Sequence, residues 1–182
     1  NSNGLVASAG SPATGTGFGS GEIADDAWTN ATGGDVNVEY TVAPVNGTCV
    51  GTEVVVVLTV SPFPVLDPAL DATVCSDEVT GITLAVAGGS VAATSYNITN
   101  INSNGLVASA GSPATGTGFG SGEIADDAWT NVTGVDVNVE YTVVPVNGTC
   151  VGAAEVVTVT ITSAPVLDPA LDATVCSDEV TG

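Results

Sequence analysis

Hydrophobic and polar positions alternate with a period of two along residues 35–45, DVNVEYTVAPV. Val36, Val38 and Tyr40 fall on one face of an extended chain, and polar side chains fall on the other. Because the side chains of a β-strand point alternately to its two faces, this pattern predicts a half-buried antiparallel strand.

A second hydrophobic run, TEVVVVLTVS at 52–61, follows the turn residues Asn-Gly-Thr at 46–48. Two strand patterns joined by turn residues predict a β-hairpin over 35–61. Pro62 and Pro64 lack the backbone N–H that a ladder needs, so we expect the hairpin to stop before them.

The rest of the pattern predicts strands at 82–87 and 91–99, separated by a Gly-Gly turn. Residues 1–21 are rich in Gly, Ser, Thr and Pro, and we expect a long loop there after a short apolar piece. Residues 22–34 carry acidic side chains near their start, and we expect one helical turn within them.

The chain repeats itself at an offset of 101 residues. Of the 81 positions that align without gaps, 12 differ, and nearly all of the changes exchange small or apolar side chains. A unit of about 100 residues matches one immunoglobulin-like sandwich and is too long for a solenoid repeat. We therefore predict an all-β chain of tandem immunoglobulin-like antiparallel β-sandwiches, arranged as beads on a string. The expected divisions are 1–64, the C-terminal part of a preceding repeat; 65–165, one complete repeat; and 166–182, the first strand of the following repeat.

Residues 1–64 lack the strands that open the complete repeat. Left alone, they would present an unpaired sheet edge and an open core. We expect a neighbour to supply those strands, either covalently upstream or as a strand donated by another subunit.

Five segments of the repeat resemble a known family. They are VCSDEVTGITL, SYNIT, IADDAWTN, VNVEYTVVPVNGTCVG and VTVTITSAPV. Together they resemble the PKD-like, immunoglobulin-like repeats of giant surface adhesins in gliding bacteria, and the similarity covers essentially the whole repeat. The resemblance implies a secreted array of β-sandwiches in an adhesin or filament, at the cell surface or outside the cell.

The charge of the chain restricts its partners. It contains 20 acidic residues and no Lys, Arg or His, for a formal net charge of −20. Phosphate backbones and anionic membranes are bound through cations, so we exclude nucleic acid and membrane surfaces as partners. We also find no apolar run long enough to span a bilayer. The partners that we expect are further copies or adjoining repeats of the chain, and a glycan or other surface ligand.

The cysteines predict a cross-link. Each full repeat has one cysteine in its first strand and one in its hairpin turn, Cys75 and Cys150. In a secreted domain such a pair indicates a disulfide, and Cys49 and Cys176 would then pair outside this chain. Two buried free thiols are the other interpretation. Zinc is not expected, because the chain has no His and no Cys-x-x-Cys motif.

Acidic residues gather where one repeat meets the next. Calcium takes six to eight oxygen ligands, so carboxylates that converge at this joint would form a calcium site. Solvated charge that keeps neighbouring domains apart is the competing interpretation. We expect no obligatory cofactor and treat calcium as an option. The candidate ligands are Asp67, Asp71, Asp77 and Glu78, with their copies Asp168, Asp172, Asp178 and Glu179.

Two tryptophans and five sequons complete the candidates. We expect Trp28 and Trp129 to fill the core beneath the glycine-rich loop, with a sugar-stacking surface as the alternative. The Asn-x-Thr sequons would be glycan acceptors in a host that glycosylates. They lie at Asn30, Asn46, Asn97, Asn131 and Asn147.

Catalysis is not expected. Neighbouring acids such as Asp25 and Asp26 point to opposite faces of a strand, and no other acid or base type is present. We predict a structural repeat of an extracellular fibre or adhesin stalk that provides reach and stiffness. The alternative is a module that binds glycans or surfaces through the glycine-rich loop, Trp28 and Trp129.

Overall fold

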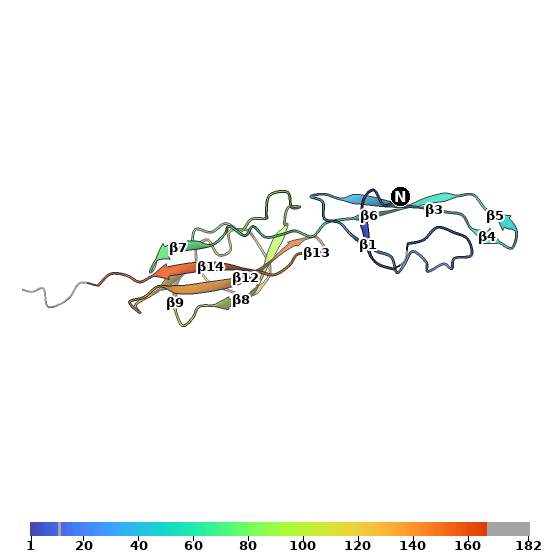
Figure 1. The fold of residues 1–182 in the computed structure, drawn as a ribbon. Coiled ribbons are helices and arrows are strands. Elements are labelled where there is room, and N and C mark those ends of the chain that lie inside the picture. The colour runs from blue at the N-terminus through green and yellow to red at the C-terminus, as the bar shows by residue number, and fades with distance from the viewer. Residues whose placement is uncertain (11, 167–182) are drawn as a thin grey trace, which may run out of the picture.

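The computed structural model describes residues 1–10 and 12–166, which form strands and turns and no α-helix. None of these residues build a helix long and apolar enough to cross a membrane. Figure 1 shows two bodies placed end to end, with residues 1–64 in one and the later strands in the other. The strands are β1 (Val6–Ala9), β2 (Ala27–Thr29), β3 (Val36–Val42), β4 (Val45–Asn46), β5 (Cys49–Val50), β6 (Val54–Val60), β7 (Ala72–Cys75), β8 (Ser95–Asn102), β9 (Val107–Ala110), β10 (Gly116–Phe119), β11 (Ala128–Thr130), β12 (Val137–Asn147), β13 (Cys150–Val151) and β14 (Glu155–Thr162).

The second repeat is built on one large sheet. Its strands lie in the order β10-β8-β12-β14-β7, and β13 pairs with the far end of β12. All neighbours are antiparallel except β14 and β7, which run parallel from Val159 beside Ala72 to Thr162 beside Cys75. The chain therefore enters the sheet in an edge strand that runs in the same direction as the strand through which it leaves.

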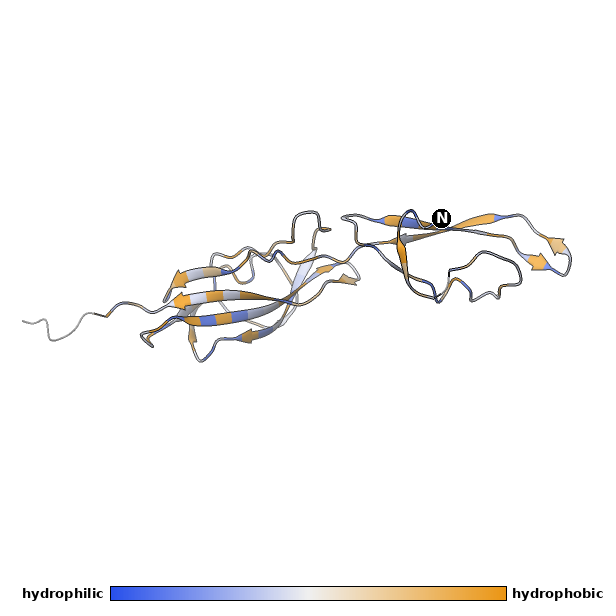
Figure 2. Cartoon of the chain, viewed as in Figure 1, coloured by the Kyte–Doolittle hydropathy of each residue, from blue (hydrophilic) through white to orange (hydrophobic). Residues whose placement is uncertain are grey.

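The core of the second repeat follows from the alternation that the sequence predicts. On β14, Val157, Val159 and Ile161 are at most 1% exposed, whereas the threonines between them are half-buried. Val139 and Tyr141 of β12 are fully buried beside them. Figure 2 shows the resulting alternation of hydrophobic and hydrophilic residues along these strands.

A second layer covers this sheet. It contains the pair β9–β11 and the loop segments that carry Ile82, Leu84 and Ile124, all buried in the same cluster as the inward side chains of β12 and β14. Trp129 of β11 closes the cluster. Two layers around one hydrophobic core are consistent with a β-sandwich, so the all-β prediction is confirmed at this level.

The first repeat consists of three separate strand pairs. β1 pairs with β2, β3 with β6, and β4 with β5. The pairing of β3 with β6, from Val36 beside Val60 to Val42 beside Val54, confirms the predicted hairpin and its turn. Among the described residues upstream of the joint, Leu5 and Val38 are the hydrophobic side chains that are buried.

Two local predictions were wrong. Ile82 and Leu84 are buried, but residues 82–87 form an irregular covering segment whose backbone bonds to loops, as in Leu84 N to Ser121 O at 2.7 Å. Residues 22–26 form a series of turns, with Ala24 N bonded to Gly21 O at 3.0 Å, and no helical turn. At 82–87 the alternation predicts the buried side chains, but the backbone partner Ser121 lies in a loop that has no periodic pattern.

Candidate functional site

The acidic joint between the repeats does not gather its carboxylates. Asp67 accepts a hydrogen bond from the N–H of Ala69, 3.0 Å away, and Glu78 accepts one from the N–H of Cys75 at 3.2 Å. Asp71 Oδ1 accepts from the N–H of Thr158 in β14, at 2.8 Å. Each of these carboxylates therefore accepts a hydrogen bond from a different segment of the backbone.

Asp77 fastens the joint to the second layer. Its Oδ1 accepts a hydrogen bond from Thr130 Oγ1 at 2.5 Å, and its N–H donates to the carbonyl of Trp129 at 2.9 Å. The hydrogen bond from Thr130, followed by those from Ser109 and Ser76, holds the pKa of the Asp77 carboxyl below its usual value. This carboxylate is therefore ionised at neutral pH, and its oxygens already accept hydrogen bonds within the protein.

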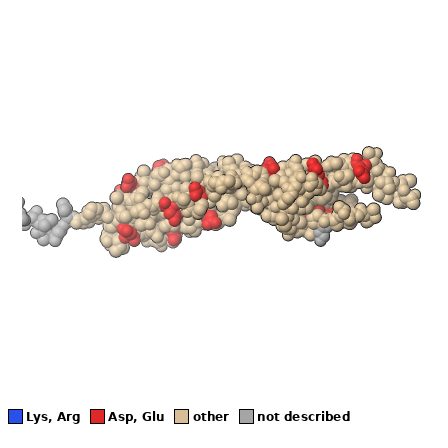
Figure 3. All heavy atoms as spheres, turned by 45° about the horizontal axis from the view of Figure 1, so that its top comes forward, with Lys and Arg blue, Asp and Glu red and all other residues tan. Residues whose placement is uncertain are grey.

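No group of three acidic or cysteine residues capable of holding a metal ion occurs within residues 1–10 and 12–166. Figure 3 shows the carboxylates scattered over the visible face, with no Lys or Arg among them. The calcium option would need Asp67, Asp71, Asp77 and Glu78 to converge, and in this copy they do not. The second set, Asp168, Asp172, Asp178 and Glu179, lies outside the described residues.

The expected pairing of Cys75 with Cys150 is wrong. Cys75 lies beside Thr162, next to the start of β12, whereas Cys150 lies beside Asn147 at the opposite end of β12. Ten strand residues separate these ends, or roughly 33 Å at about 3.3 Å per residue, and a disulfide needs Cα atoms within about 7 Å. Cys49, Cys75 and Cys150 are free thiols, and Cys176 lies outside the described residues.

The tryptophan and a tyrosine form a buried hydrogen-bonded chain with an aspartate. Trp129 Nε1 donates to Tyr141 Oη at 2.9 Å, and that hydroxyl donates to Asp127 Oδ2 at 2.9 Å. All three side chains are at most 5% exposed. The sequence predicts the burial of Trp129 but not its polar partners. The sequence feature that could have revealed these partners is Tyr141, which lies 12 residues after Trp129 on the inward-facing side of the next strand.

Burial perturbs the protonation of this chain. It raises the pKa of Asp127 to about 6, against the lowering effect of the hydrogen bond from Tyr141 and with further increases from the charges of Asp126 and Glu123. Asp127 Oδ1 is buried without a hydrogen-bond partner. Burial likewise raises the pKa of the Tyr141 hydroxyl, against the lowering effect of the hydrogen bond from Trp129.

The same chain exists in the first repeat in a more open form. Trp28 Nε1 donates to Tyr40 Oη at 2.8 Å, and Tyr40 donates to Asp26 at 2.9 Å. Here the side chains are only half-buried. Identical side chains thus make identical bonds in both repeats and differ only in how well they are covered.

The sequons divide into two kinds. Asn131 is fully buried, and its amide donates to the carbonyls of Val135 and Ile161 at 2.8 and 2.7 Å, so it is not a glycan acceptor. Asn30 is 8% exposed and makes the equivalent bonds. Asn46 is exposed, and Asn97 and Asn147 are half-buried. These three remain candidates for glycosylation.

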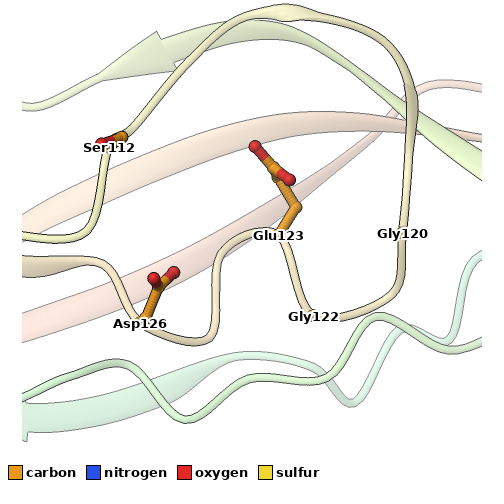
Figure 4. Close-up of a pocket in the computed structure, with 5 residues that line it drawn as sticks. All are labelled: Ser112, Gly120, Gly122, Glu123 and Asp126. Atoms are coloured by element: carbon orange, nitrogen blue, oxygen red, sulfur yellow. The ribbon is translucent and has the colours of Figure 1, made fainter.

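The glycine-rich loop of the second repeat encloses an open hollow of about 440 Å³. Figure 4 shows Glu123 and Asp126 at its edge, with Ser112 across from them. The hollow is lined by small and acidic residues, and Trp129 is buried in the core at 5% exposure. The aromatic platform that we considered for sugar stacking is therefore not available at Trp129.

A run of exposed hydrophobic residues lies on β6 of the first repeat. Val54, Val55, Val56, Val57 and Leu58 of β6 are 40–60% exposed. Val54, Val56 and Leu58 fall on one face of the strand, which we call the open face, and Val55 and Val57 fall on the other. No model of a known protein family matches this chain, and neither does any curated protein sequence.

Proposed function

We propose that this chain is a load-bearing segment of a tandem array of immunoglobulin-like β-sandwich repeats, serving as an adhesin stalk or fibre outside a bacterial cell. The near-identity of the two repeats at an offset of 101 residues supports the array. The resemblance to PKD-like adhesin repeats supports the location. A chain with 20 acidic residues and no basic side chain supports a soluble, self-repelling stalk over a nucleic-acid or membrane binder.

One observation carries the proposal: the first and last strands of the second repeat, β7 and β14, are parallel neighbours. A pull on the chain draws the start of β7 toward one end of the repeat and the end of β14 toward the other. The two strands then slide along each other, and all hydrogen bonds between them bear load together. Opening antiparallel strands from one end breaks such bonds one at a time.

Contacts at both ends of β7 reinforce this pairing. Asp71 accepts from the N–H of Thr158 before the strand begins, and Ser76 N donates to Thr162 O at 2.9 Å after it ends. Thr162 Oγ1 adds a bond to the carbonyl of Val74 at 3.3 Å. The load-bearing pair thus extends past the four residues of β7 itself.

Single-molecule force spectroscopy tests the proposal. The chain is stretched between its two ends, and we expect the second repeat to unfold in one high-force step. Releasing the residues from β7 to β14 should lengthen the chain by roughly 300 Å, since an extended chain spans about 3.4 Å per residue.

The matched control uses the same protein with attachment points at Asp136 and Ser163. These positions flank the adjacent ends of β12 and β14, where Val137 lies beside Ile161, so the pull opens the antiparallel pair one bond at a time. We expect a clearly lower force in this geometry. An end-to-end force no higher than the control force would contradict the load-bearing role.

A further inference from the structure

The connection between the two repeats, where the two bodies of Figure 1 meet, is short. The last long strand of the first repeat, β6, ends at Val60. Val65 is already bonded to the second repeat: its carbonyl accepts from the N–H of Ala87 at 2.9 Å, and its N–H donates to Ser90 Oγ at 2.9 Å. Residues 61–64 are therefore the stretch between the end of β6 and the first bonds to the second repeat.

Two prolines stiffen this stretch. Pro62 and Pro64 are both buried, and the proline ring fixes φ at about −65° in each of them. The carbonyl oxygen of Pro64 lies directly against Gly152, which follows β13, and a Cβ at Gly152 would overlap this oxygen. The second repeat therefore holds the connection from two sides, at Pro64 through Gly152 and at Val65 through hydrogen bonds.

The turn at 87–90 also touches the first repeat directly. Ser90 N donates to Ala87 O at 3.0 Å, and Gly89 has a φ of +83°, as the third residue of a type II turn requires. Gly33 of the first repeat lies against the carbonyl oxygen of Gly89, and a Cβ at Gly33 would overlap that oxygen. Backbone therefore packs on backbone at this contact, beside the covalent connection.

We propose that the turn at 87–90 is a docking surface for the loop at 31–34 of the preceding repeat, and that this contact and the seat of Pro64 on Gly152 together fix the angle between the two repeats. Domains joined by a small interface ordinarily move relative to one another. Here a contact beside the connection opposes that motion, because two contacts hold an orientation that one contact leaves free. The inference rests on the proposed function, in which a stalk reaches farther when its joints are stiff.

Gly33 and its neighbour Gly34 provide a matched pair of substitutions. A Cβ at Gly34 meets nothing within 4 Å, and the equivalent position of the second repeat carries Val135. Neither glycine has a positive φ, so alanine fits the backbone conformation at both positions. Gly33→Ala and Gly34→Ala therefore differ in one respect, the overlap of the added methyl group with the carbonyl oxygen of Gly89.

Residual dipolar couplings of backbone N–H groups measure the angle between the repeats in the full chain. An uncharged alignment medium suits a chain with a net charge of −20. We expect the couplings of both repeats to fit one common alignment tensor in the unmodified chain and in Gly34→Ala. In Gly33→Ala we expect each repeat to fit its own tensor, because the methyl group forces the loop at 31–34 away from the turn at 87–90.

Separate tensors for the two repeats of the unmodified chain overturn the proposal. So does a Gly33→Ala variant in which each repeat keeps its own fold and the angle stays the same. If Gly33→Ala disturbs the first repeat itself, Gly152→Ala decides the question, because it changes the angle from the second repeat and leaves every residue of the first in place. An unchanged angle in that variant likewise overturns the proposal. None of these results affects the force measurement, which tests the pairing of β7 with β14 and not the joint.

Discussion

Asp127 places a carboxylate inside a core that offers it only one hydroxyl. Tyr141 satisfies Oδ2, and Oδ1 has no partner. Burial disfavours the ionised carboxylate, and its pKa is therefore raised to about 6. Burial of an ionisable group at this position makes the stability of the second repeat depend on pH.

We expect the free energy of unfolding to rise as the pH falls from 7 toward 4. The folded chain takes up a proton on Asp127 near pH 6, whereas the unfolded chain does so near the ordinary value of 3.8. The folded state therefore binds more protons between these values, and acidification favours it. The gain is about 3 kcal/mol over the whole window, and it is lost again as the pH rises through 6.

Urea unfolding at a series of pH values measures this effect. The other carboxylates add their own pH dependence, so Asp127→Asn is the reference: it has the same neighbours and no titrating group. We expect the pH slope of the unmodified chain to exceed that of the variant between pH 4 and 7. Parallel slopes would show that Asp127 titrates normally in the folded state.

At the scale of elements, identical segments adopt different structures according to their neighbours. Residues 116–119, GTGF, form β10 because β8 lies beside them, with Gly116 opposite Ile98. The same four letters at 15–18 form no strand in the first repeat, where no counterpart of β8 is present. Local sequence therefore permits these strands, and a partner strand decides whether they form.

A matched pair of substitutions compares the loss of stability at a covered and at an uncovered position of the same strand. Val157→Ala removes methyl groups from a side chain that is 1% exposed, and we expect a loss of about 2 kcal/mol. Val56→Ala makes the same change where 44% is exposed, and we expect less than about 1 kcal/mol. Hydrogen exchange of β12 and β3 reports the two repeats separately.

The periodic pattern identified most of the large sheet. The hairpin at 35–61 and the inward face of its second copy followed from alternation alone, because a period of two assigns each side chain to a face. The strand predicted at 91–99 begins at Ser95 and continues to Asn102. Burial of Trp129 was likewise predictable from its size.

Strand direction was not predictable in the same way. The pairing of Cys75 with Cys150 assumed that the first strand ends near the hairpin turn. Alternation is the same for parallel and antiparallel neighbours, so the sequence does not specify that β7 runs with β14. Because β7 runs parallel to β14, Cys75 lies at the opposite end of the sheet from Cys150, and the predicted disulfide is absent.

The molecule as a whole carries one sign of charge. With 20 acidic residues and no basic side chain, long-range electrostatic forces in the folded state are almost all repulsive. Added salt screens them with a Debye length of about 10 Å at 0.1 M and about 3 Å at 1 M. We therefore expect the melting temperature to rise with NaCl concentration and then level off.

Calcium and magnesium at equal ionic strength distinguish screening from a specific site. The carboxylates of the described residues do not converge, so we expect the two ions to raise the melting temperature equally. Thermal unfolding monitored by circular dichroism provides the measurement, with NaCl as the monovalent reference. A clearly larger shift with calcium would contradict this expectation.

The parallel course of β7 and β14 also gives the molecule a direction. The second repeat admits the chain at one end and releases it at the other, so repeats built on the same plan would all point the same way. A fibre of such units has two chemically different tips, one ending in the hairpin of β12 and β13 and the other where β14 leaves the sheet. An anchor that recognises one tip orients the whole fibre, and a cap that fits the other sets its length.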